Sequence, residues 1–178
     1  MRHFPVQVVG GIALFEGHVT EMQTGEGETI TAVMPAFLRA VPVPGHGCHV
    51  ITVNDYLAKR DAKMMGPIYK QLGLSVGYIQ TPMESDERRD AYSKDMTYGT
   101  AKEMGSDFLR DRLRMGVVVQ TQSRRRIFSR GQDEQVVQRG NHFALIDEAD
   151  SILIDEARTP LIIGLTQPND SATVNLLR

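Results

Sequence analysis

The chain has 178 residues, of which 41% are hydrophobic and 24% are charged, and these ordinary globular values exclude disordered and fibrous classes. Its formal net charge of −2 gives no reason to expect a polyanionic partner for the chain as a whole. The single cysteine, Cys48, excludes an internal disulfide framework, and no apolar run is long enough to span a membrane, so we expect a soluble cytoplasmic domain.

Apolar runs alternate with helical patterns along the chain, which predicts βαβ units around a mostly parallel sheet. In chain order we expect a helix over 5–15, a strand over 18–23, a helix over 29–40, a strand over 49–53, a helix from Asn54 or Asp55 to about residue 72, and strands over 75–80, 96–99, 143–146 and 161–163. Residues 143–146 are almost wholly apolar and precede acidic residues. This pattern is typical of a buried central strand that delivers carboxylates to its C-terminal edge.

Residues 110–140 differ from the rest of the chain, because they contain eight arginines, no lysine and three acidic residues. One interpretation is a patch that binds phosphate groups of nucleic acid or of lipid headgroups. The other is a solvated insertion loop between two strands. The loop is favoured, since Phe128 is the one aromatic residue among the arginines and stacking on bases is poorly supported.

A glycine-rich loop, Thr24-Gly25-Glu26-Gly27, separates a predicted strand from a predicted helix. Such a turn lets backbone N–H groups surround phosphate at the positive end of the helix dipole. The usual phosphate loop adds a lysine for the outer phosphates and a hydroxyl for Mg²⁺. Here Thr29 supplies the hydroxyl, but Glu28 occupies the lysine position, so the loop alone is a weak signal.

An acidic cluster, Asp147-Glu148-Ala149-Asp150, directly follows the apolar strand. Phosphoryl transfer needs a carboxylate that holds Mg²⁺ and a group that positions the attacking water. Asp147 suits the first task, and Glu148 suits the second. The same residues also fit an ordinary helix start, where acidic side chains favour the dipole.

Longer stretches resemble the first nucleotide-binding domain of SecA-type preprotein translocase ATPases. The matching segments are MRHF at 1–4, VQ at 6–7, TGEG at 24–27, TVNDYLA at 52–58, GPIY at 66–69, LGLSVG at 72–77, TYGT at 97–100, FLRD at 108–111 and DEADSILIDEARTPL at 147–161. The last run is far more specific than an acidic tetrad. The resemblance covers about 1–111 and 142–163.

This resemblance implies a fold and a domain organisation. The fold would be α/β, a three-layer sandwich with a mostly parallel sheet, as in the helicase-like (RecA-like) motor domains of P-loop NTPases. Residues 1–164 would form part of such a domain, with an arginine-rich insertion at about 112–140. Residues 165–178 would be a tail where the preprotein-binding insertion of the family begins.

The resemblance also implies roles for individual residues, with ATP and Mg²⁺ as cofactors. Gln7 would contact adenine, and the segment Thr24, Gly25, Glu26, Gly27, Glu28 and Thr29 would surround the phosphates, with Thr29 also reaching Mg²⁺. Asp147 would hold Mg²⁺ through water, Glu148 would be the catalytic carboxylate, and Arg158 would couple the site to a second motor domain.

The partners implied by the family are the SecYEG channel and unfolded preprotein, at the cytoplasmic side of the inner (plasma) membrane. Contact with acidic phospholipids and self-association into a homo-oligomer are compatible with this location, whereas a nucleic acid partner is not expected. In the family, ATP hydrolysis drives preprotein export.

Glu28 departs from the family, which has a lysine at this position. Two unit charges about 4 Å apart interact by roughly 4 kcal/mol at an effective dielectric constant near 20, so exchanging attraction for repulsion costs several tenfold steps of affinity. We therefore expect weak or absent ATP hydrolysis. Two alternatives stay open: a fragment of a DEAD-box RNA helicase core, which shares the acidic tetrad, and a degenerate domain that acts as a non-catalytic binding module.

Overall fold

The computed structural model describes residues 2–42, 47–122 and 136–163, with side chains of the fifth helix described up to Met115. The helices are α1 (Pro5–Phe15), α2 (Glu28–Ala40), α3 (Asp55–Gln71), α4 (Ser85–Tyr92) and α5 (Ala101–Gln122). The strands are β1 (Gly47–Thr52), β2 (Val76–Tyr78), β3 (Met96–Thr100) and β4 (Asn141–Ile146), and a π-helical segment, η2 (Ser151–Asp155), follows β4.

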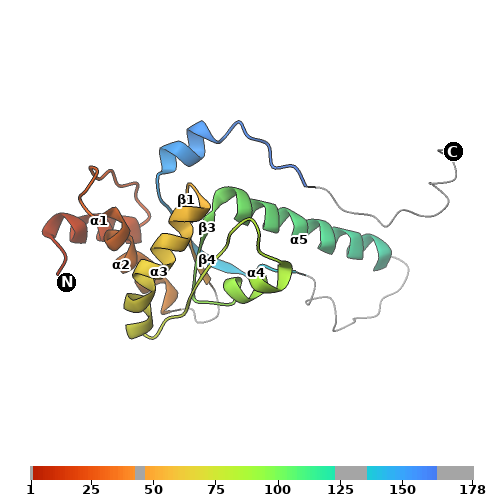
Figure 1. Ribbon diagram of the computed structural model, residues 1–178, viewed down its shortest axis with the longest axis horizontal. Coiled ribbons are helices and arrows are strands. Elements are labelled where there is room, and N and C mark those ends of the chain that lie inside the picture. The colour runs from red at the N-terminus through yellow and green to blue at the C-terminus, as the bar shows by residue number, and fades with distance from the viewer. Residues whose placement is uncertain (1, 43–46, 123–135, 164–178) are drawn as a thin grey trace.

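The four described strands form one parallel sheet in the order β2-β3-β1-β4. Helices α2 and α3 contact one face of the sheet, α4 and α5 contact the other, and α1 packs on α2 away from the sheet (Figure 1). The expected three-layer α/β sandwich with a parallel sheet is therefore confirmed. All four strands end at the same edge, where the loops that follow them meet.

Alternation along the strands supplies a separate core to each face of the sheet. On the α2–α3 face, the buried side chains include Cys48, Val50, Met96, Tyr98 and Leu145, which pack against apolar residues of the two helices. The opposite face has a smaller core, formed by Ile79, Ala91, Tyr92, Met104 and Val137. The sheet is thus fixed from both sides, and its C-terminal edge is held in place by two independent cores.

Helix α3 begins where the sequence predicted. The side chain of Asn54 accepts a hydrogen bond from the backbone N–H of Leu57 at 2.9 Å, which satisfies one of the unpaired amides of the first turn. Asp55 then adds a negative charge at the positive end of the helix. The helix therefore starts immediately after the C-terminal end of β1.

Two predicted strands do not form. Residues 18–23 are not a strand, and Val19 is 95% exposed because no described strand lies beside this segment. Residues 161–163 are also outside any strand, and Ile162 is 87% exposed. Short apolar runs of this kind need a neighbouring strand to become part of a sheet. The described part of the chain does not provide one.

The strand expected over 143–146 exists as β4, but its expected central position was wrong. Within the described residues β4 pairs with β1 alone and lies at the edge of the sheet. Leu145 is buried, whereas Ala144 and Ile146 are exposed. Composition indicated burial on both sides, but burial depends on what packs against a strand, and this tertiary information is absent from its own sequence.

The described parts of the arginine-rich segment are not a solvated loop. Helix α5 continues to Gln122, and Arg110 on it forms an ion pair with Asp107 at 2.8 Å. After residues 123–135, which lie outside the described part, Val137 is buried in the smaller core. The boundary at 164 and the tail 165–178 also lie outside the described residues and stay predictions.

A buried ionic network joins α4 to α5. Arg88 is 5% exposed, and its guanidinium donates to Asp107 at 2.8 Å, to Glu103 at 2.6 Å and to three backbone carbonyls, those of Gln80, Thr81 and Met83. Burial lowers the pKa of Arg88, but the hydrogen bonds and charges of the two carboxylates outweigh it, so the net shift is upward. Arg88 therefore stays charged.

The same network holds the segment that precedes β4. The Asp111 carboxylate accepts the backbone N–H of Val137 at 3.1 Å and that of Gln138 at 2.9 Å. The side-chain amide of Gln138 donates to the Tyr92 hydroxyl at 3.1 Å and to the Met104 carbonyl at 2.8 Å. Each of these buried polar groups has a partner, as stable burial requires.

Across the parts of the chain that the structure describes, no helix is long and apolar enough to cross a lipid bilayer.

Candidate functional site

The glycine-rich loop leads directly into α2 and has the backbone form that its glycines permit. Gly25 has φ +91° and Gly27 has φ +88°, a left-handed conformation that side-chain-bearing residues rarely adopt. Gly27 is also the N-cap of α2. A Cβ atom on Gly27 would lie 2.5 Å from the side-chain nitrogen of Gln7, whereas one on Gly25 would meet nothing within 4 Å. Gly27 is therefore required both for its backbone conformation and for the space that the Gln7 side chain occupies, whereas Gly25 is required for its backbone conformation alone.

Gln7 joins α1 to this loop. Its side-chain oxygen accepts the backbone N–H of Phe4 at 3.0 Å, and its side-chain nitrogen donates to the Glu26 carbonyl at 2.7 Å. The residue is 6% exposed. Its amide already has an internal bond at each end, so the structure shows a scaffolding role, and its predicted contact with adenine stays a prediction.

The remaining loop residues close the turn and begin the helix. Glu26 folds back, and its carboxylate accepts the backbone N–H of Gln23 at 3.0 Å. Thr24 is exposed, and Thr29 is half-buried at the second position of α2. The N-terminus of this helix presents free amide groups and the positive end of its dipole, which is the ordinary geometry of an anion site.

The acidic pair lies at the C-terminal end of β4. The backbone N–H of Asp147 donates to the Ile51 carbonyl at 2.9 Å and so extends the pairing of β4 with β1. Glu148 has φ +52°, the one positive φ among the described non-glycine residues, and its N–H donates to the Asp147 carboxylate at 3.0 Å. Strained backbone of this kind is common at functional sites.

The loop and the acidic pair, which lie about 120 residues apart in the sequence, come together in space. Partial burial raises the pKa of Glu28, and the negative charges of Asp147, Glu148 and Glu26 raise it further. Burial also raises the pKa of Asp147, to which Glu148 and Asp61 contribute. The N-terminus of α2 therefore lies near the carboxylates that follow β4.

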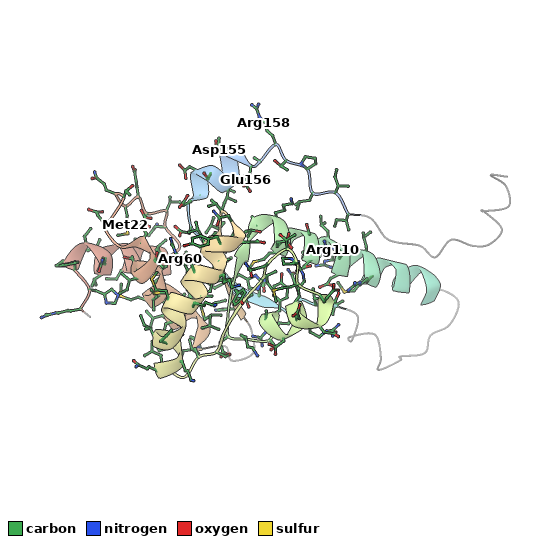
Figure 2. All side chains as sticks on the ribbon, in the orientation of Figure 1. Met22, Arg60, Arg110, Asp155, Glu156 and Arg158 are labelled. Carbon is green, nitrogen blue, oxygen red and sulfur yellow. The ribbon has the colours of Figure 1, made fainter. Side chains whose placement is uncertain are left out.

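Sequence reasoning missed two residues of α3 beside this edge. Asp61 is 2% exposed and accepts a hydrogen bond from the Arg60 guanidinium at 2.7 Å. Arg60 lies close enough to Asp147 for each to shift the pKa of the other. Figure 2 labels Arg60 on α3. The sequence did contain a signal for these two residues: an Arg-Asp pair in the second turn of a helix that begins at the C-terminal edge of the sheet.

Arg158 does not join this cluster. It follows η2 in an exposed segment, and Figure 2 shows it pointing away from the body of the domain. Asp155 and Glu156 precede it on the same exposed stretch. Its predicted coupling role requires a partner beyond the described residues and stays a prediction.

Comparison with known proteins identifies the family. The model of the SecA DEAD-like domain matches residues 1–177. The chain is 58% identical to Protein translocase subunit SecA 2 of Rhodopirellula baltica over 92% of its length, 53% identical to Protein translocase subunit SecA of Oleidesulfovibrio alaskensis over 97%, and 50% identical to the SecA subunit of Francisella philomiragia over 99%.

The chain spans 25%, 18% and 17% of the length of these three curated relatives, so it corresponds to one part of each. The helicase alternative is not favoured, because the matching family model and the names of these relatives all point to SecA. The three-layer fold and the paired loop and acidic motifs agree with that assignment. The chain belongs to the SecA DEAD-like domain family.

Proposed function

We propose that this chain is the ATP-binding part of a SecA-type translocase that couples ATP hydrolysis to preprotein export, and that Glu28 impairs its hydrolysis. One observation carries the proposal: the N-terminus of α2 lies near the Asp147–Glu148 pair at the C-terminal edge of the sheet. This is where open α/β sheets bind ligands. The family membership supports the same reading.

The residues present fit Mg²⁺ better than they fit phosphate. Carboxylate and hydroxyl oxygens, which Mg²⁺ prefers, are available from Asp147 and Thr29. The left-handed glycines and the amides of α2 suit a phosphate group. Glu28 does not, because its negative charge adds to the acidic cluster at the position where a cation would hold the outer phosphates.

In this proposal each of these residues has a defined role. Thr29 and Asp147 hold the metal, the latter through water, and the segment 24–29 surrounds the phosphates. Glu148 positions the attacking water and accepts its proton, and Gln7 lies next to the adenine. Mg·ATP supplies the phosphoanhydride bond whose hydrolysis releases the free energy for transport.

The proposal extends to partners and location only through the family. SecYEG and unfolded preprotein are the proposed partners, with peripheral attachment at the inner membrane, and contact with acidic phospholipids and homo-oligomer formation belong to the same proposal. Arg158 would reach a second motor domain. The exposed segment around Arg158 supports this role, since an exposed arginine is available to another surface.

The test is calorimetric titration of Mg·ATP into the chain and into its Glu28→Lys variant. We expect the variant to bind at least about tenfold more tightly, because the substitution removes a repulsion and adds an attraction. Asp86→Lys is the matched control. It makes the same charge change at an exposed position on α4, on the opposite face of the sheet, and should leave affinity unchanged.

Each result has a definite meaning. Tight binding by the parent chain would contradict the argument from the charge of Glu28. Equal gains in the Glu28→Lys and Asp86→Lys variants would show that net charge, and not this site, controls affinity. If none of the three proteins binds, the degenerate binding module becomes the better interpretation.

A further inference from the structure

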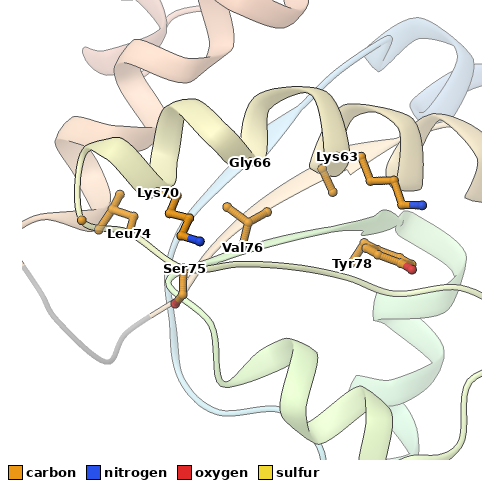
Figure 3. A pocket seen from close by; sticks show the side chains of 9 residues that line it. Lys63, Gly66, Lys70, Leu74, Ser75, Val76 and Tyr78 are labelled. Carbon is orange, nitrogen blue, oxygen red and sulfur yellow. The ribbon is translucent and has the colours of Figure 1, made fainter.

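A hollow lies away from the acidic edge, between the C-terminal half of α3 and the edge strand β2 (Figure 3). Its volume is about 570 Å³. Apolar atoms make up most of its floor, which is formed by Leu74, Val76 and the ring of Tyr78, and Gly66 leaves room on the helix side. A hollow of this size holds several side chains of an extended peptide.

The free edge of β2 borders this hollow. Backbone hydrogen bonds from Met96 to the Ser75 carbonyl and from Ile79 to the Tyr98 carbonyl show that alternate residues of the strand point their backbone groups toward β3. In a parallel pair, the residues between them point their N–H and C=O groups the other way. Val76 and Tyr78 therefore present main-chain donors and acceptors outward, and no described strand pairs with them.

The charged side chains that line the hollow are lysines, and one lining residue, Ser75, donates its backbone N–H and its hydroxyl to the Asp95 carboxylate at 2.8 and 2.6 Å. Lys63 and Lys70 line the hollow from α3. The Nζ atom of Lys59 lies over the ring of Tyr78, 5.8 Å from the ring centroid. Neither Lys63 nor Lys70 has an ion pair with any acidic residue that the structure describes, and no acidic residue is among those lining the hollow. An apolar floor beneath two unpaired lysines favours a ligand that combines apolar and acidic side chains.

We propose that this edge binds an extended acidic peptide segment of another protein, which adds to the sheet as a strand beside β2. Its main chain pairs with the outward groups of Val76 and Tyr78. Side chains on alternate positions of the added strand lie on the same face as Val76 and Tyr78, and so point into the hollow beside Lys63 and Lys70. Main-chain pairing supplies affinity, and the lysines select acidic sequences.

The first experiment measures fluorescence anisotropy of a fluorescein-labelled heptapeptide whose side chains on one face are glutamate, valine, glutamate and valine, with threonine at the positions between them. We expect saturable binding to the intact chain that weakens as salt is raised. Lys63→Glu and Lys70→Glu should each weaken binding about three- to tenfold. Lys102→Glu is the matched control, since it makes the same change at an exposed position on α5, and it should leave binding unchanged.

Two further measurements separate strand addition from simple charge attraction. A peptide with alternate backbone amides methylated keeps its charges but cannot pair with a strand on that side, so it should not bind. The Lys63→Glu/Lys70→Glu double variant should prefer a valine–lysine peptide, and this reversal also shows that the variant is folded. Equal binding of the methylated and unmethylated peptides, or a double variant without any charge preference, would overturn the proposal.

Discussion

Two groups of carboxylates in this domain have opposite electrostatic arrangements. Glu103, Asp107 and Asp111 between α4 and α5 are buried, and each is bonded to a guanidinium or to backbone amides. Glu28 and Asp147, with Glu148 beside them, lie at the C-terminal edge of the sheet, and the charges of these residues act on one another.

The difference shows which acidic group serves the fold and which is available for a ligand. In the network around Arg88, the cost of burying charge is offset by paired charges and by hydrogen bonds to every acceptor, which makes the arrangement specific and rigid. At the edge, burial and like charges raise the pKa of both Glu28 and Asp147. Carboxylates whose pKa is perturbed in this way are typical of functional sites.

Removal of the central cation should have the largest effect. Arg88→Ala leaves Glu103 and Asp107 buried beside no guanidinium from α4, and it should lower the free energy of unfolding by about 3–5 kcal/mol. Arg89→Ala is the control on the same helix. Its guanidinium pairs with Asp86, whose side chain is 91% exposed, and donates to the Val136 carbonyl at 3.2 Å, so the loss should be about 1–2 kcal/mol. Urea unfolding curves measure both, and similar losses for the two variants would contradict the comparison.

Replacing each of the two loop glycines with alanine should lower the stability of the protein, and by different amounts. Gly27→Ala combines a left-handed backbone with a Cβ atom 2.5 Å from the Gln7 side-chain nitrogen, and should cost about 1–3 kcal/mol from the backbone plus the cost of moving Gln7. Gly25→Ala has the same backbone strain but open space around it. Thermal unfolding of both variants should rank Gly27→Ala as the less stable; equal stability of the two variants would show that Gln7 moves without cost.

The smallest effect concerns pH. Since the pKa of Glu28 is raised above 4.5 in the folded state, that state binds more protons than the unfolded chain, and its stability falls as pH rises above about 4.5. Glu28→Gln removes this titration. The variant should therefore be more stable than the parent at pH 7, by at most about 0.5 kcal/mol, and the gain should vanish at pH 4. Thermal unfolding between pH 4 and 8 measures the gain, and a variant less stable than the parent at pH 7 would contradict the assigned repulsion.

Local signals in the sequence predicted much of this fold. The Asn54 cap, the apolar spacing of α2 and the glycines of the loop all depend on residues near one another in the chain, and each was confirmed. The proximity of Glu28 to Asp147 was predicted for a reason that is half right: Asp147 follows strand β4 at the C-terminal edge of the sheet, whereas residues 18–23 before the loop do not form a strand.

Features that depend on distant packing could not be predicted. The acidic partners of Arg88 lie 15 and 19 residues away on another helix, and nothing in its local sequence selects them. The close approach of Gln7 to Gly27 likewise joins residues that are distant in the sequence, and nothing near either residue predicts it. Among the described residues β4 lies at the edge of the sheet, a position that depends on its neighbours and that its apolar composition did not indicate.

The position of β1 between β3 and β4 has a consequence for the order in which the protein assembles. β1 ends at Thr52, whereas β4 begins at Asn141, so a ribosome makes about ninety residues between them. At ordinary rates of synthesis this interval lasts on the order of ten seconds. During that time β1 can already pair with β3, but its other edge waits for β4. The growing chain therefore carries an open strand edge until β4 has been made, and nascent-chain chaperones can bind this edge during the interval.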